Sequence, residues 1–257
     1  MHARELFDLQ GKTAIVTGGG SGIGRQMAEG LAEMGANLVL CARKAERCER
    51  AAAELEHLGV RALGLACDVR DRAQVDAVVA TALAELGRVD VVVNNAGTVW
   101  GAPPEEMPLE GWQKVIDVNL TGVFLFAQAA GRVMIERDGG SIVNIASVAG
   151  LRGAPPEIVN TVVYHASKGG VIAFTRDLAC KWARHGIRVN AIAPGWFPSG
   201  MSRWVLDRHG DELARHIPLG RVGGPHDLKG AIVFLASPAS AYVTGHTLVV
   251  DGGQSVS

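Results

Sequence analysis

The feature that most restricts the fold of this chain is a regular alternation of short apolar segments with longer polar ones. Short runs rich in β-branched residues recur at 13–18, 37–42, 61–67, 89–95, 141–147, 187–193 and 246–252. Such near-continuous apolar runs are typical of parallel strands that helices cover on both faces. Between them lie stretches of helical length rich in Ala, Glu and Arg, such as 45–58 and 72–86. The alternation predicts an α/β protein with a Rossmann-type, doubly wound parallel sheet of seven strands and helices on both faces.

Composition and charge fit one soluble domain. The chain has 257 residues, of which 48% are hydrophobic and 20% charged, so a sizeable core is expected. No linker, repeat or low-complexity tract divides it, and we expect a single dinucleotide-binding and catalytic domain over 1–257. Segment 196–224 is the one long piece without a clear strand, and we interpret it as a substrate lid. The net charge of −1, with no basic run, argues against nucleic acid and anionic membranes as partners.

Targeting and metal signals are absent from the sequence. The first twenty residues lack the apolar core of a signal peptide, and no apolar run approaches the roughly 18 residues of a membrane span. The four cysteines show no CxxC spacing, and the eight histidines show no metal-binding spacing. We therefore expect a cytoplasmic protein without a metal.

A glycine-rich turn lies between the first predicted strand and the first predicted helix. It reads TGGGSGIG over 17–24. Glycines there allow a tight turn and let the backbone approach a pyrophosphate, and the helix N-terminus offers unpaired N–H groups to the phosphates. The segment lacks the GK[ST] ending of a P-loop. We predict that the turn binds a dinucleotide through Gly18, Gly20, Ser21, Gly22, Ile23 and Gly24.

The end of the second strand indicates which dinucleotide. A chain that binds NAD carries an acid about 20 residues after the glycine turn, but here Ala42 is followed by Arg43 and Lys44. A guanidinium can bind a 2′-phosphate with two hydrogen bonds, which favours NADP(H) over NAD(H). The alternative is that these cations are only the solvated start of a helix. Many NADP-preferring proteins also carry a basic residue where this chain has Ser21.

Several further motifs, in a fixed order, resemble the short-chain dehydrogenase/reductase superfamily over essentially the whole chain. After TGGGSGIG come CDV (67–69), NNAG (94–97), DVNLTG (117–122), NIASVAG (144–150), YHASK (164–168), RVNAIAPG (188–195) and DGG (251–253). Within the superfamily the chain is most similar to 3-oxoacyl-(acyl carrier protein) reductases, including the rhamnolipid-type reductase. Gluconate 5-dehydrogenase-like proteins are also close.

The resemblance implies a catalytic tetrad of Asn119, Ser147, Tyr164 and Lys168. Tyr164 would give its proton to the substrate carbonyl oxygen as hydride arrives at carbon, and Ser147 would hydrogen-bond that oxygen. Lys168 would hold the nicotinamide ribose, while Asn119 would anchor a water that resupplies protons through the lysine. All four residue types are present at the matching positions.

The resemblance also implies coenzyme contacts beyond the glycine turn. Three groups are expected: an adenine site, the adenosine ribose side, and the surroundings of the nicotinamide. They consist, respectively, of Asp68 and Val69; of Asn95, Ala96 and Gly97; and of Pro194, Gly195, Phe197 and Ser199. Ser199 stands where the family usually has Thr, but the hydroxyl is kept.

The pair Tyr164 and Lys168 has a physical interpretation of its own. A free tyrosine has a pKa of about 10, which is high for acid–base catalysis near neutrality. Residues four apart lie on the same helix face, and a nearby ammonium stabilises phenolate. We therefore expect Lys168 to lower the pKa of Tyr164. His165 should point away from this face and take no part in proton transfer.

The substrate is less constrained than the chemistry. Ser147 and Tyr164 are 17 residues apart, about four more than in many relatives, and a Pro-rich loop fills the interval. Our first hypothesis is an NADPH-dependent reductase of a 3-oxoacyl thioester or similar ketone. The alternatives are a polyol or secondary-alcohol dehydrogenase of the gluconate 5-dehydrogenase type, and a dinucleotide-sensing protein without turnover. The resemblance also implies a homotetramer, with helices near 111–137 and 164–185 at one interface.

Overall fold

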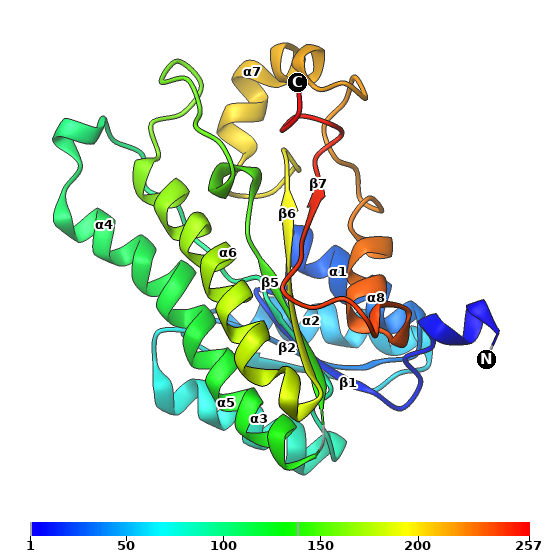
Figure 1. Ribbon diagram of the computed structural model, residues 1–257. Helices are drawn as coiled ribbons and strands as arrows, with labels where there is room; N and C mark the ends of the chain where they lie inside the picture. The colour runs from blue at the N-terminus through cyan, green and yellow to red at the C-terminus, as the bar shows by residue number, and fades with distance from the viewer. Residues whose placement is uncertain (1, 138) are drawn as a thin grey trace.

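All seven strands form one parallel sheet in a computed structural model of the chain, which describes residues 2–137 and 139–257 (Figure 1). The strand order is β3-β2-β1-β4-β5-β6-β7, with every neighbouring pair parallel. The strands are β1 (Thr13–Thr17), β2 (Asn37–Ala42), β3 (Ala62–Ala66), β4 (Val91–Asn94), β5 (Gly140–Ile145), β6 (Ile187–Pro194) and β7 (Thr247–Val250). The predicted doubly wound sheet is confirmed.

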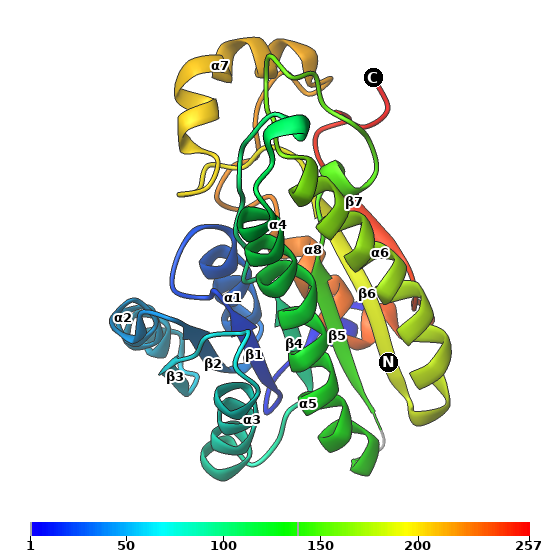
Figure 2. The ribbon, with the colours of Figure 1, turned by 90° about the vertical axis from the view of Figure 1, so that its left-hand side faces the viewer.

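Helices cover both faces of this sheet, as Figure 2 shows. The helices α1 (Gly22–Glu33), α2 (Ala45–Leu55) and α8 (Lys229–Ala236) pack on one face. The helices α3 (Arg72–Leu86), α5 (Gly122–Glu136) and α6 (Val162–Trp182) pack on the other. Because each face of a strand is covered, inward and outward side chains are both apolar, which explains the uninterrupted hydrophobic runs of the sequence.

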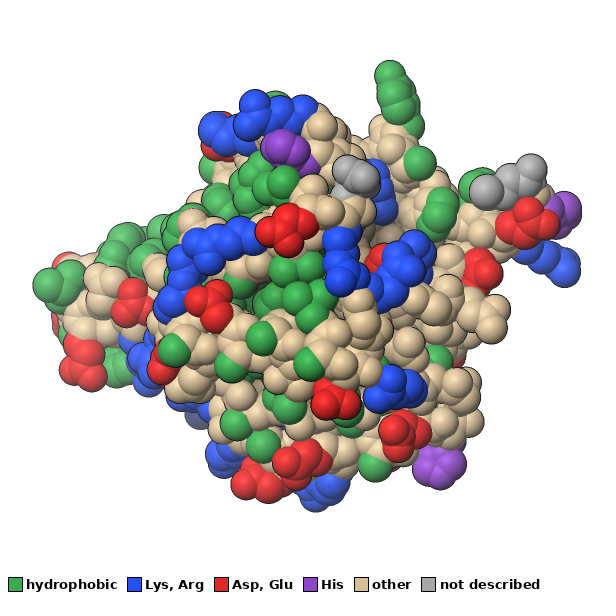
Figure 3. All heavy atoms as spheres, turned by 90° about the horizontal axis from the view of Figure 1, so that it is seen from below, with side chains coloured by type: hydrophobic (Ala, Val, Ile, Leu, Met, Phe, Trp, Pro, Cys, Tyr) green, Lys and Arg blue, Asp and Glu red, His purple; other side chains and the backbone are tan. Residues whose placement is uncertain are grey.

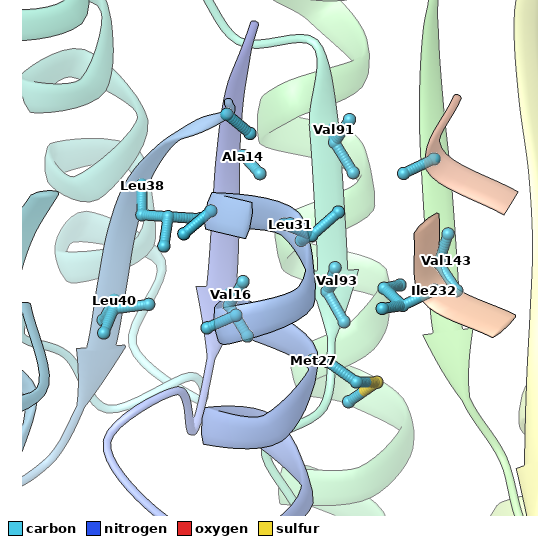
Figure 4. Close-up of a cluster of buried hydrophobic side chains, with 14 of the residues drawn as sticks. Ala14, Val16, Met27, Leu31, Leu38, Leu40, Val91, Val93, Val143 and Ile232 are labelled. Carbon is cyan, nitrogen blue, oxygen red and sulfur yellow. The ribbon is translucent and has the colours of Figure 1, made fainter. Parts of the chain in front are cut away.

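The cores on the two faces consist mainly of aliphatic side chains. Figure 4 shows the first of them, where Met27 and Leu31 of α1 lie against Val16 of β1 and Ile232 of α8. The interior strand β1 is completely buried, with Ile15 pointing to the opposite core. A fully buried strand between two cores gives the carboxyl edge of the sheet a rigid support.

The long helix beside the site contains a π-helical turn. The helix α4 (Leu109–Ile116) continues through a π-helical segment, Asp117–Thr121, directly into α5. This combined helix passes the length and hydropathy criteria of a membrane span, contrary to the expectation from the sequence, with a mean hydropathy of 1.4. Half of that window is buried inside the protein, as is usual for a core helix, and Phe126 and Met134 are fully buried in the second core. Widened turns of this kind often occur at functional sites.

The predicted lid segment 196–224 contains one helix, α7 (Arg203–His216), that the sequence did not indicate. In both ribbon views α7 lies beyond the carboxyl ends of β5 and β6, near the chain's C-terminal residues (Figures 1 and 2). The remainder of the segment contains no strand, as predicted. Val205 and Leu213 bury one side of the helix, whereas Trp204 is 49% exposed.

Candidate active site

One large cavity opens at the carboxyl ends of the strands, with a volume of about 920 Å³. This is the edge of an α/β sheet where ligands usually bind. It brings together residues predicted from five separate motifs: Gly18, Ser21, Gly22, Ile23, Gly24, Asn95, Ala96, Gly97, Ser147, Tyr164, Lys168, Pro194, Gly195, Phe197 and Ser199. The predicted residues Gly20, Arg43, Lys44, Asp68, Val69 and Asn119 do not line it.

The glycine turn is shaped by two close approaches. Gly18 has φ +67°, a left-handed backbone conformation that residues other than glycine rarely adopt. A Cβ atom at Gly24 would lie 2.4 Å from both the Gly18 carbonyl oxygen and Asn95 Nδ2, so no larger residue fits there. Ser21 is the N-cap of the twelve-residue helix α1, and its side chain makes no capping hydrogen bond. The backbone N–H groups of this helix end are therefore available to an anion.

The loop after β4 is tied to this turn by Thr17 and Asn95. Thr17 Oγ1 accepts hydrogen bonds of 2.9 Å from the backbone N–H groups of Asn95 and Ala96. Asn95 Nδ2 in turn donates to the Thr17 carbonyl oxygen at 2.8 Å. These bonds fix the NNAG segment as a second wall of the cavity and explain why a polar threonine is buried at the end of β1.

Ser147 and Tyr164 meet at the centre of the cavity. Ser147 follows β5 and begins a 3₁₀ turn, where its Oγ accepts a hydrogen bond of 3.1 Å from Ala149 N–H. Tyr164 lies in the first turn of α6 and is partly buried. The Ser147 hydroxyl is near enough to the phenol of Tyr164 to lower its pKa. Because both belong to rigid elements, they can hold one substrate oxygen between them.

Lys168 lies one turn further along α6 and is 4% exposed. Its Nζ donates a hydrogen bond of 2.6 Å to the Ile145 carbonyl oxygen at the end of β5 and lies 5.6 Å from the centre of the Tyr164 ring. Burial lowers the pKa of Lys168 to about 8, because removing water disfavours the ammonium.

The predicted lowering of the Tyr164 pKa is wrong for the protein alone. Burial raises the pKa of Tyr164, and the nearby Ser147 hydroxyl opposes this only in part. The sequence shows that Lys168 lies on the same face, but it does not show how far the two groups are removed from water. Desolvation penalises the phenolate as it penalises the ammonium.

Asn119 lies in the π-helical turn and is completely buried. Its Oδ1 accepts from Thr98 N–H at 2.8 Å, and its Nδ2 donates to the Thr98 carbonyl oxygen and to Ser167 Oγ, both at 3.0 Å. Both amide hydrogens are therefore used to hold the segment after NNAG against α6. The predicted water-anchoring role stays a prediction, and it would rest on the backbone carbonyl or the remaining Oδ1 lone pair.

The basic residues after β2 lie outside the cavity, at the edge beyond the glycine turn. Arg43 and Lys44 are exposed, and no ion-pair partner lies within 4.0 Å of either among the described residues. Arg47, one turn into α2, is a third exposed cation that the sequence reasoning missed, and its backbone packs 3.0 Å from where a Gly20 Cβ would be. The carboxylate of Asp68 binds Arg70 at 2.6 Å, and Val69 packs against Gly122.

The other half of the cavity is built from the loop after Ser147, from α7 and from the C-terminal segment. Apolar groups come from both sides: from the α7 side Trp196, Met201, Trp204, Val205 and Leu213, and from the loop Val148, Ala149, Ala154, Pro155, Ile158 and Val159. Polar groups likewise come from both sides: from the loop, the start of α6 and the C-terminal segment Arg152, Glu157, Thr161, His165, Gln254 and Ser257, and from the α7 side Ser202, Glu212 and His216. His165 thus lines the cavity despite its predicted orientation. The described residues contain no cluster of three or more His, Cys, Asp or Glu side chains suited to a metal.

Comparisons with known proteins agree with this site. Residues 18–255 match the family model described as enoyl-(acyl carrier protein) reductase. The chain is 41% identical to D-threitol dehydrogenase of Mycolicibacterium smegmatis, covering 97% of this chain and 95% of that one. It is 40% identical to 3-oxoacyl-[acyl-carrier-protein] reductase of Synechocystis, with coverage of 95% and 97%.

A solved structure is equally similar. The gluconate 5-dehydrogenase of Burkholderia cenocepacia, in complex with NADP and tartrate, superimposes with a TM-score of 0.94 at 40% identity, and all of both chains is covered. The resemblance seen in the motifs is therefore confirmed over the whole length. The chain belongs to the short-chain dehydrogenase/reductase superfamily of oxidoreductases.

Proposed function

We propose that this protein is an NADP(H)-dependent dehydrogenase that interconverts a secondary hydroxyl group and a ketone on a polyhydroxylated substrate. The observation that carries the proposal is the convergence of Ser147, Tyr164 and Lys168 in one cavity with the glycine turn. A dinucleotide bound at the turn would have its reactive end beside the two hydroxyl groups. A sensing protein without turnover would not require this arrangement.

Each catalytic side chain has a role that its surroundings support. Tyr164 donates its proton to the carbonyl oxygen in reduction and accepts the hydroxyl proton in oxidation, and Ser147 holds that oxygen by a hydrogen bond. Lys168, fixed by the Ile145 carbonyl, places a buried positive charge near the ring of Tyr164. Asn119 keeps the Thr98 backbone in place and thereby positions the segment after NNAG, from which Val99 lines the cavity.

The residues present fit NADP(H). The Gly18 turn and the free end of α1 suit a pyrophosphate, and Ser199 lies beside Gly22, where the chain after β6 would border the nicotinamide. Arg43, Lys44 and Arg47 are exposed cations without an acidic partner within 4.0 Å among the described residues, which suits a 2′-phosphate. When bound, the coenzyme supplies or removes the hydride. Similar proteins crystallised with NADP, including the gluconate 5-dehydrogenase, support this choice.

Polar side chains that line the cavity favour a hydroxylated substrate. Arg152, Glu157, Thr161 and His165 place hydrogen-bonding groups along the side next to Tyr164, where several substrate hydroxyl groups would need partners. Relatives named as threitol and gluconate dehydrogenases agree with this better than with our first hypothesis, a 3-oxoacyl reductase. That function stays the second candidate, because the apolar α7 wall suits an acyl chain and a 3-oxoacyl reductase is 40% identical.

Assembly and location are proposed on separate grounds. Exposed apolar residues lie on the outer helices, namely Leu109 of α4, Phe124 of α5 and Val162 of α6, and on β7 at Val249. Figure 3 shows hydrophobic side chains gathered at the left-hand side, where α4 lies, while acidic and basic groups are mixed over the rest of that face. We propose a homotetramer that uses these helices and the β7 edge. Four free cysteines fit a reducing cytoplasm.

The direct test is a substrate panel with purified protein. D-gluconate, D-threitol and sorbitol are offered with NADP⁺, and 5-ketogluconate and a 3-oxoacyl thioester are offered with NADPH. The proposal expects the highest kcat/KM with a polyol, a polyhydroxy acid or its ketone. A thioester preferred over all of these by ten-fold or more would replace the proposal with the second candidate.

A further inference from the structure

We propose that Arg152 binds the carboxylate of an anionic substrate, so that the site selects polyhydroxy acids over neutral polyols. The inference rests on the proposed function and sharpens it, since the named relatives include enzymes for substrates of both kinds. It starts from the cations of the cavity. Arg152 and Lys168 are the lysine or arginine side chains that line it among the described residues.

Only one of these two cations is free to meet the distal end of a substrate. Lys168 is buried, and its ammonium already donates to the Ile145 carbonyl beside Tyr164. Arg152 is exposed at the cavity wall, and no carboxylate of the described residues lies within 4.0 Å of its guanidinium. An unpaired guanidinium facing a ligand cavity is a binding site for a carboxylate, which it can hold with two parallel hydrogen bonds.

The guanidinium is also held in place. One nitrogen, Nη1, donates to the Gln254 carbonyl oxygen, which leaves most of its five N–H groups unused by protein hydrogen bonds. Gln254 belongs to a turn in which Asp251 accepts from the N–H groups of Gly253 at 2.9 Å and Ser255 at 2.7 Å. The C-terminal segment therefore supports Arg152 in the direction of the cavity, which reduces the entropy cost of binding an anion.

Arg152 lies five residues after Ser147 on the same loop, and this places it near the reaction centre. The 3₁₀ turn Val148–Gly150 has Leu151 as its C-cap, and the Arg152 N–H donates to the Val148 carbonyl at 3.1 Å. Arg152 thus continues the same short turn that carries Ser147. A substrate whose carbonyl lies between Ser147 and Tyr164 can direct its acid end toward Arg152.

Acidic groups in the cavity complement this arrangement. Glu157 lies on the same loop and lines the same cavity without an ion pair to Arg152. It can accept hydrogen bonds from substrate hydroxyl groups. Glu212 also lines the cavity but lies 3.5 Å from His209 on α7. A guanidinium and a carboxylate kept apart on one loop match a molecule with an acid at one end and hydroxyl groups along its length.

The test compares gluconate with sorbitol, which has the same six carbons but CH₂OH in place of the carboxylate. We expect the wild-type protein to prefer gluconate, and Arg152→Ala to lower kcat/KM for gluconate by about 10- to 100-fold. The same variant should change kcat/KM for sorbitol by less than about three-fold, and Arg152→Lys should restore only part of the loss. Arg203→Ala, which removes an exposed charge from α7 outside the cavity, is the matched control and should affect neither substrate.

Two kinds of failure can be separated. If Arg152→Ala lowers kcat/KM equally for gluconate and sorbitol, or if the wild type prefers sorbitol, Arg152 does not bind a substrate carboxylate. The proposed function then still stands. If the wild type turns over no polyol, polyhydroxy acid or corresponding ketone, the proposed function is wrong and this inference fails with it. NADPH titration by fluorescence shows that each variant still binds coenzyme and is folded.

Discussion

The two halves of the cavity are built in different ways. The coenzyme half consists of the glycine turn, the NNAG segment and the carboxyl ends of buried strands, joined by Thr17, Asn95 and Asn119 through hydrogen bonds of 2.8 to 3.0 Å. The substrate half consists of the loop after Ser147, of α7 and of the C-terminal segment, and many of its side chains are exposed. The coenzyme half is therefore held in place by the sheet itself, whereas the substrate half consists of segments that extend from the sheet.

This difference separates chemistry from choice of substrate. Proton transfer requires Ser147, Tyr164 and Lys168 to keep their positions relative to the coenzyme. Ser147 directly follows the buried strand β5, and the other two residues belong to α6, which packs on the sheet. Selectivity requires only that side chains at the far wall differ in charge and shape. Loops on a rigid support can change without disturbing the reaction.

The largest expected effect is at the junction of the two halves. Tyr164→Phe removes the phenolic proton and keeps the ring, so kcat should fall by about 100-fold or more. The dissociation constant of NADPH should change little, because the coenzyme half is untouched. Steady-state kinetics and fluorescence titration measure the two quantities. A variant that keeps near wild-type kcat would remove Tyr164 from the mechanism.

A smaller effect is expected at the adenosine end of the coenzyme half. Arg43→Ala removes a guanidinium that can bind the 2′-phosphate, so kcat/KM should fall for NADPH by about 10- to 100-fold relative to NADH. Ala42→Asp added to it should favour NADH further, by repelling phosphate and binding the ribose. Lys44 and Arg47 can retain part of the preference, and Arg47→Ala serves as the comparison. A wild type that prefers NADH would show that Arg43 is only a solvated helix-start residue.

The buried ammonium of Lys168 should cost stability. Its pKa is about 8 in the folded protein and about 10.4 in an unfolded chain, so stability rises with pH between these values, and the penalty is fully present below pH 8. Lys168→Met removes the charge but leaves the Ile145 carbonyl without its donor. We expect the free energy of unfolding to increase by about 1–2 kcal/mol at pH 7.

That gain should vanish by pH 10.5, where the wild-type amine is neutral in the folded protein and about half neutral in the unfolded chain, so that little of the penalty remains. Urea unfolding at the two pH values, at one protein concentration, provides the measurement. A loss of stability at pH 7, or a gain of equal size at both pH values, would show that burial of the ammonium is not the cause.

The sequence predicted the sheet well because the central strands are buried on both faces and therefore read as apolar runs, and the less buried edge strands β3 and β7 are still mostly apolar in sequence. It also identified Tyr164 and Lys168 as neighbours, since helix geometry alone places residues four apart on one face. It failed for the pKa of Tyr164, which depends on burial by the surrounding chain. Arg152 was missed for the same reason: its place in the cavity depends on contact with Gln254, 102 residues away.

The central claim is that coenzyme binding and substrate selection are independent, and a double-mutant cycle tests it directly. Arg43→Ala changes the coenzyme half, and Trp204→Ala changes the apolar wall of the substrate half, where we expect a loss of only about three-fold in kcat/KM for substrate. With NADPH as coenzyme, the loss of kcat/KM in the double variant should equal the product of the losses in the two single variants, to within a factor of about two. This is the result expected for distant sites without shared partners. A deviation of ten-fold or more would contradict the account and show that the two halves act as one unit.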